Sequence, residues 1–147
     1  MKPSILFSSA GRRGRLLRNA QESIGSKCDI NATDNNATAP ALYFATNEYV
    51  VPRINDPEYV DTVLDICKKA NVKAITLIDP EIEILSANRE KFLEAGVLPL
   101  CPADEITARC CFDKYEMFKY LTEKGIPTPL TYHDFDDFKK GIDEGKI

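Results

Sequence analysis

The apolar and polar residues of the first hundred positions alternate in a way that predicts strands and helices in turn. Ser4–Ser8 is a short, almost continuous apolar run, which is typical of a strand covered on both faces. Residues 13–24 then carry apolar side chains at the spacing of one helical face, at Leu16, Leu17, Ala20 and Ile24. The chain is therefore predicted to begin with a strand, a tight turn and a helix.

The same alternation continues to about residue 102. We expect further strands at residues 27–33, 48–51, 74–78 and 97–101. One helix is predicted to begin with Asp56 as N-cap and Pro57 in the first helical position, and its core face holds Val60, Val63, Leu64 and Cys67. Another is predicted to start at Asp79-Pro80-Glu81 and to end at Gly96. Strands that alternate with helices predict an α/β fold, so residues 1–102 are expected to form a Rossmann-like parallel sheet with helices on both faces.

Residues 103–147 have a different pattern, in which helices outnumber strands. Helices are predicted at 103–109, 113–124 and 135–142, with an extended piece at 128–132. Asp113 followed three residues later by Glu116 is the pattern of a capping box, and Asp134 opens the last helix in a similar way. This segment is expected to be a linker helix and the beginning of a second, α+β domain.

The charge of the chain is unevenly distributed. The net charge is −4, but residues 1–20 contain Lys2 and four of the seven arginines and no acidic residue. A local basic site on an acidic body favours a small anionic ligand over a nucleic acid, so no nucleic-acid partner is expected. No apolar run approaches the length of a membrane span, so no membrane partner is expected either.

The five cysteines are odd in number and scattered, at Cys28, Cys67, Cys101, Cys110 and Cys111. They form no C-x-x-C pair, and His133 is the only histidine of the sequence. This usage predicts reduced, mostly buried thiols in a cytoplasmic protein and no metal site.

The turn after the first strand is the strongest candidate site, because open parallel sheets bind ligands beyond the carboxyl ends of their strands. Hydroxyls, backbone amides at a helix N-terminus and guanidinium groups should converge there and bind a carboxylate, phosphate or bicarbonate. The residues concerned are Ser8, Ser9, Gly11, Arg12 and Arg13. Arg15 and Arg18 are equally consistent with a solvated basic helix face.

Three acidic residues are predicted to lie at the same edge of the sheet. Ser9-x-Gly11-x-x-Gly14 partly matches the dinucleotide fingerprint, and Asp34 stands where a ribose-binding acid would. Asp79 and Glu81 could orient a substrate, but an aspartate and an early glutamate are also ordinary helix-start residues. Two alternative functions therefore stay open. One is an NAD(P)-binding or nucleotide-binding Rossmann domain, and the other is a non-enzymatic module that binds an anionic metabolite.

The order of the motifs resembles the N-terminal part of ATP-grasp enzymes, specifically of carbamoyl-phosphate synthase large-chain-like proteins. The resemblance covers essentially the whole chain. It is carried by Ser8-Ser9-Ala10-Gly11-Arg12-Arg13, Asp34 followed by Ala39-Pro40-Ala41-Leu42, Tyr49-Val50-Val51-Pro52, Leu77-Ile78-Asp79-Pro80-Glu81, Asp113-Lys114-Tyr115 and Gly125-Ile126-Pro127-Thr128-Pro129.

This resemblance implies a Rossmann-like pre-ATP-grasp domain at 1–102 and the start of an ATP-grasp domain at 103–147. In that family two lobes clamp Mg-ATP, a carboxylate or bicarbonate becomes an acyl phosphate, and an amine or similar nucleophile attacks it. The resemblance implies that Lys114 reaches the nucleotide phosphates. It also implies that the substrate side is lined by Ser9, Gly11, Arg12, Arg13, Asp79 and Glu81.

The sequence departs from the family pattern in two ways. Gly14 stands where such sequences usually carry a larger apolar residue, and the family's first ATP-binding lysine, glycine-rich loop and acidic magnesium ligands do not follow Ile147. We therefore expect a truncated chain that binds neither ATP nor Mg²⁺ tightly and does not catalyse alone, with no catalytic residue of its own. The apolar side chains of residues 103–147 are expected either to fold back onto the Rossmann-like domain or to form a homodimer through that segment.

Overall fold

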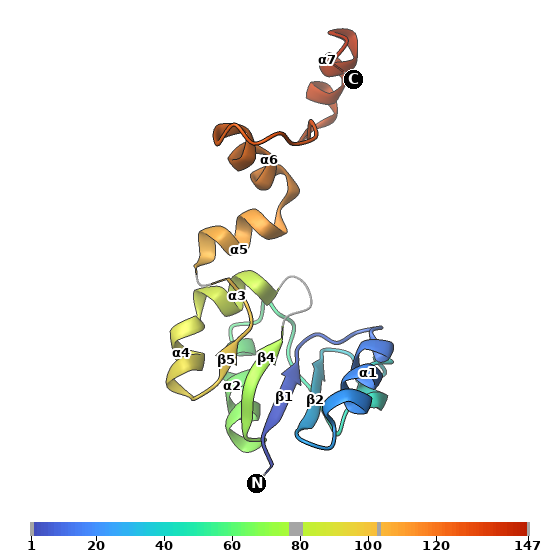
Figure 1. The fold of residues 1–147 in the computed structure, drawn as a ribbon, viewed down its shortest axis with the longest axis vertical. Coiled ribbons are helices and arrows are strands. Elements are labelled where there is room, and N and C mark those ends of the chain that lie inside the picture. The colour runs from blue at the N-terminus through green and yellow to red at the C-terminus, as the bar shows by residue number, and fades with distance from the viewer. Residues whose placement is uncertain (1, 77–80, 103, 147) are drawn as a thin grey trace. The chain divides into compact units, whose positions relative to one another are not determined.

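The computed structural model describes residues 2–76, 81–102 and 104–146 (Figure 1). These form two compact units, Met1–Ala108 and Arg109–Ile147. Each unit is described by itself.

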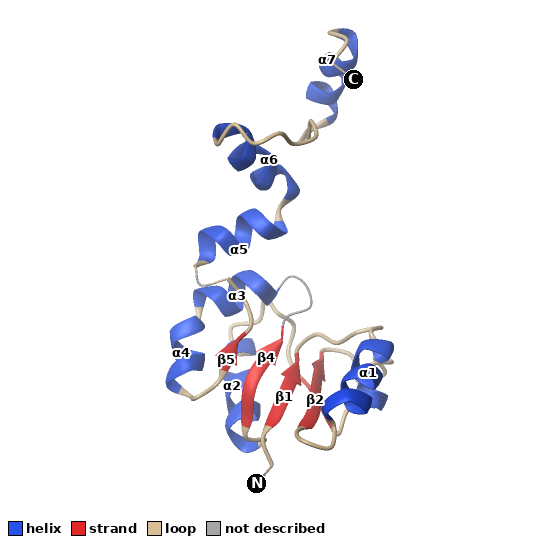
Figure 2. Cartoon of the chain, viewed as in Figure 1, coloured by secondary structure: helices blue, strands red, loops and turns tan. Residues whose placement is uncertain are grey.

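The first unit contains a five-stranded sheet in the order β3-β2-β1-β4-β5, in which every paired neighbour is parallel (Figure 2). The predicted Rossmann-like α/β fold is confirmed. Its strands are β1 (Ser4–Phe7), β2 (Asp29–Asp34), β3 (Asn47–Val50), β4 (Val72–Thr76) and β5 (Leu98–Pro99).

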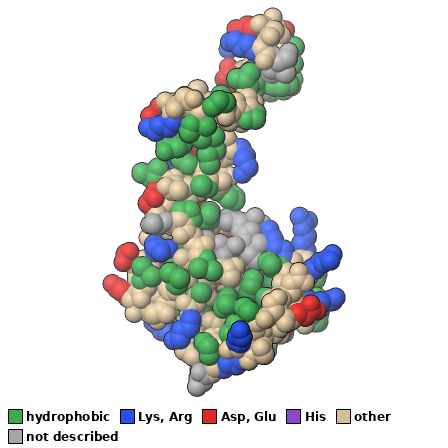
Figure 3. Space-filling view, viewed as in Figure 1, with side chains coloured by type: hydrophobic (Ala, Val, Ile, Leu, Met, Phe, Trp, Pro, Cys, Tyr) green, Lys and Arg blue, Asp and Glu red, His purple; other side chains and the backbone are tan. Residues whose placement is uncertain are grey.

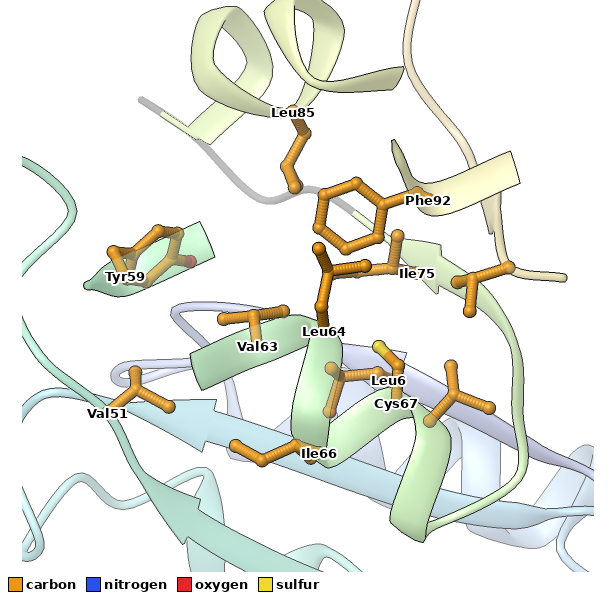
Figure 4. Close-up of a cluster of buried hydrophobic side chains, with 12 residues drawn as sticks. Leu6, Val51, Tyr59, Val63, Leu64, Ile66, Cys67, Ile75, Leu85 and Phe92 are labelled. Atoms are coloured by element: carbon orange, nitrogen blue, oxygen red, sulfur yellow. The ribbon is translucent and has the colours of Figure 1, made fainter. Parts of the chain in front are cut away.

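Helices cover both faces of this sheet. Successive residues of a strand point to opposite faces, so neighbouring residues of one strand pack in two different cores. Leu6 of β1 belongs to the core cluster that holds Tyr59, Val63 and Phe92, whereas its neighbour Phe7 belongs to the cluster around α1 (Figure 4). The helical elements of this unit are α1 (Gly14–Ile24), η1 (Leu42–Phe44), α2 (Tyr59–Lys69), α3 (Glu81–Ala87), α4 (Arg89–Glu94) and the first part of α5 (Glu105–Phe112).

Three predicted boundaries in the first unit are wrong. Helix α2 begins at Tyr59 and not at Pro57, because the Asp56 carboxylate accepts the Glu58 N–H at 2.9 Å in a separate turn. The helix predicted to run to Gly96 is broken at Asn88, whose side-chain amide donates to the backbone oxygen of Ile84 at 2.9 Å and competes with the regular helix. Strand β5 is only two residues long, since Pro99 has no N–H to donate to a ladder.

Two side-chain predictions also need correction. Leu17 of α1 is buried, but Leu16 is 43% exposed, so the apolar stripe of that helix is narrower than the sequence predicted. The five cysteines are free, yet only Cys67 is buried, while Cys111 is exposed and the other three are half-buried.

The second unit contains the end of α5, together with α6 (Lys114–Glu123) and α7 (Phe135–Asp143). Asp113 caps α6 as predicted, accepting the N–H groups of Tyr115 and Glu116 at 2.8 and 3.0 Å. Glu116 pairs with Lys119 instead of returning to the cap, so the capping box is half formed. Asp134 caps α7 by accepting the Asp137 N–H at 2.9 Å.

The second unit has almost no core of its own. Gly141 is the only buried residue among the described residues 109–146. Seven large apolar side chains of this unit are exposed: Phe112, Tyr120, Ile126, Leu130, Phe135, Phe138 and Ile142. None of the helices in the described part of the chain is long and apolar enough to cross a membrane.

Candidate functional site at the carboxyl edge of the sheet

The turn after β1 is fastened to both neighbouring strands. The N–H and the hydroxyl of Ser8 both donate to the backbone oxygen of Thr76 in β4, at 3.2 and 3.0 Å. On the other side, the Ala10 N–H donates to the backbone oxygen of Thr33 in β2 at 2.9 Å. The predicted site residue Ser8 is therefore fully buried and holds the turn in place.

Asp34, the last residue of β2, fixes the same turn from the side. One of its carboxylate oxygens accepts the Gly11 N–H at 2.8 Å and the other accepts the Asn36 N–H at 2.9 Å. The predicted anion site used the Gly11 amide, but this amide is directed at Asp34. Because both oxygens already accept backbone donors, Asp34 also gives little support to the ribose-binding alternative.

The backbone of the turn is unusual at two positions. Ser9 has a φ of 44° and Gly11 a φ of 54°, both in the left-handed region. This conformation suits glycine but is uncommon for serine, and such outliers concentrate at functional sites. Ser9 is half-buried, so its hydroxyl group is held close to the carboxyl ends of the strands.

Gly14 begins α1 and has a packing reason for its lack of a side chain. A Cβ at this position would lie 2.6 Å from Cε2 of Phe44, which belongs to η1. The Arg18 guanidinium lies over the Phe44 ring, 4.6 Å from the ring centroid. The departure from the family pattern at Gly14 is therefore explained by close packing of α1 against η1, and Arg18 contributes to this packing.

The remaining arginines of the turn form a basic face. Arg12 and Arg15 are exposed and Arg13 is half-buried. Figure 3 shows basic side chains gathered on the side of the molecule where α1 lies. The nearby Asp34 carboxylate weakens the positive field of this face.

A cavity of about 420 Å³ opens at this edge of the sheet. It brings together three residues that the sequence predicted, Ser9, Asp34 and Glu81, whereas Ser8, Gly11, Arg12 and Arg13 do not line it. The rest of its wall is formed by Asn35, Pro52, Arg53, Ile54 and Asn55. Asp79, the other predicted acid, lies outside the described residues.

Asp34, Glu81 and Arg53 are the ionisable side chains that line this cavity. Glu81 begins α3 and is fully buried, at a helix N-terminus where a carboxylate is stabilised. Arg53 is exposed and follows β3 at the same edge. The sequence analysis missed Arg53, although its place directly after a strand and Pro52 was a usable signal.

Tyr59 is the second residue that the sequence analysis missed. It begins α2, is 1% exposed, and lies at the margin of the core cluster in Figure 4. Burial raises its pKa above the usual range, the Glu81 and Asp34 carboxylates raise the pKa further, and the Ser9 side chain opposes them. Its place four residues before Val63, on the apolar stripe of α2, could have revealed it.

Two hydroxyl groups at this edge are buried without a hydrogen-bond partner among the described residues. They are Oη of Tyr59 and Oγ1 of Thr33. Buried polar groups are nearly always paired, so each unpaired one calls for an explanation.

Lys114, predicted to contact ATP, belongs to the second unit. It is exposed, and its ammonium group donates to the backbone oxygen of Phe112 at 3.2 Å. No group of three or more His, Cys, Asp or Glu side chains in the described part of the chain could hold a metal ion.

The first unit is similar to a known protein family and to several solved structures. The family model described as the PylC-like N-terminal domain matches residues 5–100, about two thirds of the chain. A search of curated proteins finds no match.

Several solved structures share the fold at low identity. Glycinamide-RNase-transformylase T from Mycobacterium tuberculosis is 15% identical with a TM-score of 0.63, and the match covers 86% of this chain and 37% of that one. The biotin carboxylase domain of a single-chain bacterial carboxylase is 13% identical with a TM-score of 0.60, over 97% and 34% of the two chains. That of the Hydrogenobacter thermophilus 2-oxoglutarate carboxylase is 17% identical with a TM-score of 0.61, over 86% and 28%. The chain thus spans about a third of the length of these proteins, and the predicted pre-ATP-grasp fold is confirmed.

Proposed function

Because the chain belongs to the PylC-like N-terminal domain family, we propose that it is the substrate-side domain of an ATP-dependent ligase. The reaction would join a carboxylate or bicarbonate to an amine or ammonia through an acyl phosphate, as in carbamoyl-phosphate synthase large-chain-like proteins. The observation that carries this proposal is the cavity at the carboxyl edge of the sheet. It unites Ser9, Asp34 and Glu81 within the first unit, beside the basic face of α1.

In this proposal the first unit binds and orients substrate. Arg12 and Arg13 provide forked donors that suit a carboxylate or bicarbonate. Asp34 keeps the turn after β1 in shape through the Gly11 N–H, and Ser8 fastens it to β4. These contacts pre-organise the site, so that little freedom is lost when the substrate binds.

ATP and Mg²⁺ would be bound elsewhere in the complete ATP-grasp fold. The similar Hydrogenobacter thermophilus domain was solved with MgADP and bicarbonate, which supports nucleotide and bicarbonate as ligands of the complete enzyme. Lys114 would be the contribution of this chain to the nucleotide phosphates. Lys114 is the one cation that the resemblance assigns to the phosphates, and no cluster of metal-ligating side chains lies among the described residues. We propose that the chain alone does not turn over ATP.

The test has a binding arm and an activity arm. Acetate and bicarbonate are titrated into the ¹⁵N-labelled chain, and saturable shifts are expected in the amides of residues 9–15. Arg12→Gln and Arg13→Gln together should weaken this binding about tenfold, the effect of losing charge-assisted hydrogen bonds. Lys27→Gln, which removes an exposed cation in the turn after the C-terminal end of α1, is the matched control.

In the activity arm, Mg-ATP with acetate or bicarbonate and ammonia should release no ADP above background. Turnover that is abolished by Lys114→Ala would contradict the proposed division of labour, because a substrate-side domain lacks the phosphate ligands that catalysis needs.

A further inference from the structure

The segment between α6 and α7 is an extended stretch of chain without a hydrogen-bonded neighbour. Residues 126–132 form no helix, strand, turn or bend (Figure 2). Pro127 and Pro129 have a φ of about −65° and disfavour a helical conformation for the residues before them, so the stretch is extended. No backbone N–H of residues 128–132 has a hydrogen-bond partner among the described residues. An unpaired extended backbone is a place where another strand can be added.

Both ends of this stretch are fixed to helices of the second unit. The Ile126 N–H donates to the backbone oxygen of Leu121 in α6 at 2.9 Å. At the other end, the Tyr132 hydroxyl lies where a Cβ of Gly141 in α7 would be, and the Tyr132 ring centroid is 5.8 Å from that of Phe138. The stretch is therefore held in place before a partner arrives, which lowers the entropy cost of adding a strand.

The prolines make the two edges of this stretch unequal. Alternate residues of a strand direct their N–H groups to opposite edges, so residues 127, 129 and 131 share one edge and residues 128, 130 and 132 share the other. Pro127 and Pro129 remove two of the three N–H groups from the first edge, whereas the second edge keeps all three. A surface that adds one strand but disfavours another closes as a pair and does not grow into a fibre.

We propose that the edge of residues 128, 130 and 132 pairs with the same edge of a second copy of the chain, antiparallel about a two-fold axis at Leu130. In this register Leu130 faces Leu130 of the other copy and Thr128 faces Tyr132, so every hydrogen-bonded position carries an N–H group. Pro129 faces Thr131 at a non-hydrogen-bonded position, where the missing N–H of proline is not needed. This interface belongs to the second unit and does not depend on the proposed function.

The second unit exposes enough apolar surface for such an interface. Seven large apolar side chains are exposed in the described part of this unit, and four of them are aromatic, at 37–74% exposed. At about 200 Å² for a whole aromatic side chain, these four present roughly 400 Å², half of the ~800 Å² per partner that a stable interface buries. The three aliphatic side chains and the strand backbone contribute toward the other half.

The charges of the second unit allow two copies to approach each other. Residues 109–147 contain seven basic and eight acidic residues, a net charge of −1, whereas the whole chain carries −4. Residues 125–132 contain no charged residue at all. Two copies therefore meet little repulsion along this edge, which also lacks the lysines that protect exposed edges from pairing.

The experiment measures the mass of the 147-residue chain by sedimentation equilibrium, from about 1 μM to about 1 mM. We expect a monomer–dimer equilibrium, and in the dimer slow amide hydrogen exchange at Leu130 and Tyr132 but fast exchange at Thr131. A monomer at every concentration would overturn the proposal. Slow exchange at Leu130 and Tyr132 in such a monomer would mean that the chain covers its own strand, and fast exchange that nothing pairs with it.

Substitutions at Leu130 test the two-fold axis, because this residue faces its own counterpart. Leu130→Lys and Leu130→Glu should each raise the dissociation constant of the dimer at least about tenfold, since two leucines are lost from the interface and like charges lie directly opposite each other. An equimolar mixture of the two variants should dimerise more tightly than either variant alone, because opposite charges then face each other.

Thr131→Lys is the matched control, at a position that does not face itself, and should dimerise like the wild type. The amide resonances of residues 29–34 should stay unchanged in every variant, since β2 belongs to the first unit. Equal weakening by Thr131→Lys and Leu130→Lys would overturn the proposed register. A mixture of Leu130→Lys and Leu130→Glu that dimerises no more tightly than the separate variants would overturn the two-fold axis at this residue.

Discussion

The two ends of the parallel sheet treat their buried polar groups in opposite ways. At the N-terminal end, the Asn31 amide donates to the Ser4 hydroxyl at 3.0 Å and accepts from the Asn47 amide at 2.9 Å. The Ser4 hydroxyl in turn donates to the backbone oxygen of Ala70 at 2.7 Å. At the carboxyl end, Thr33 and Tyr59 have hydroxyls without partners among the described residues.

Asn31 and Thr33 make the contrast sharp, because they are two residues apart in β2 and therefore point to the same face of the sheet. Both are fully buried. The network of Asn31 is complete within the protein and serves the fold, whereas the Thr33 and Tyr59 hydroxyls have no partner among the described residues. Polar groups that satisfy one another stabilise a structure, and groups left over identify where a ligand is expected.

The largest expected effect is at the N-terminal end. Asn31→Ala should lower the free energy of unfolding by about 2 kcal/mol, because a buried and a partly buried hydrogen bond are lost together with the packing of the amide. Asn47→Ala, at an exposed position of β3, should cost less. Urea unfolding measures both, and an Asn31→Ala variant as stable as the wild type would break the contrast.

The next largest effect is expected in the stability of the chain at alkaline pH, to which Tyr59 at the carboxyl end contributes and Asn31 at the N-terminal end does not. The folded chain keeps the Tyr59 proton at a pH where the unfolded chain loses it, so this stabilisation is complete below about pH 10 and is lost as pH rises further, by about 1.4 kcal/mol per pH unit. Burial raises the pKa of Cys67 from 9.0 to about 12, which adds a loss of the same sign.

Tyr59→Phe should therefore show a shallower fall of stability above pH 10 than the wild type, since both retain Cys67. Asn31→Ala should keep the wild-type slope, because asparagine does not titrate. Urea unfolding between pH 8 and pH 11 tests this. Parallel curves for the wild type and Tyr59→Phe would mean that Tyr59 is not protected as described.

A smaller effect is expected where the carboxyl-edge turn enters α1. Gly14→Ala should lower the free energy of unfolding by about 1 kcal/mol, since the new Cβ would force Phe44 to move. In a Phe44→Ala background the same change should stabilise by up to about 1 kcal/mol, because alanine favours the helix. A double-mutant cycle by urea unfolding checks this, and additive effects would exclude the close contact as the cause.

The smallest effect is expected for the unpartnered hydroxyls. Thr33→Val and Tyr59→Phe should leave stability unchanged or raise it by up to about 1 kcal/mol, because each removes a buried group that has lost its hydration. Thermal unfolding at neutral pH measures both. A clear loss of stability in either variant would show that the hydroxyl is paired in solution.

Much of the fold could be predicted from the sequence because it depends on local patterns. The apolar runs predicted β1 to β4, and the helix signals predicted the caps at Asp113 and Asp134. The start of α2 could not be predicted, since Asp56 satisfies a turn as well as it would a cap. The break at Asn88 depends on one side chain that competes with the helix backbone.

The candidate site was predicted only in part, for a physical reason. Ser9, Asp34 and Glu81 were found because the carboxyl ends of parallel strands meet at one edge. Tyr59 and Arg53 were missed because their local signals, a place on the apolar stripe of α2 and a place directly after β3 and Pro52, indicate a core position and a strand end but not a site. Asp34 was expected to face a ligand, but its preference for the Gly11 N–H depends on the shape of the turn after β1.

The most direct test of the contrast between the two ends is one NMR titration of the whole chain with glycine, which carries both an ammonium group and a carboxylate. We predict saturable amide shifts at Ser9, Asn35 and Arg53, at the carboxyl end, and none at Ser4, Asn31 and Asn47. Shifts of equal size at both ends, or none at the carboxyl end, would contradict the conclusion that the unpartnered hydroxyls identify a ligand site.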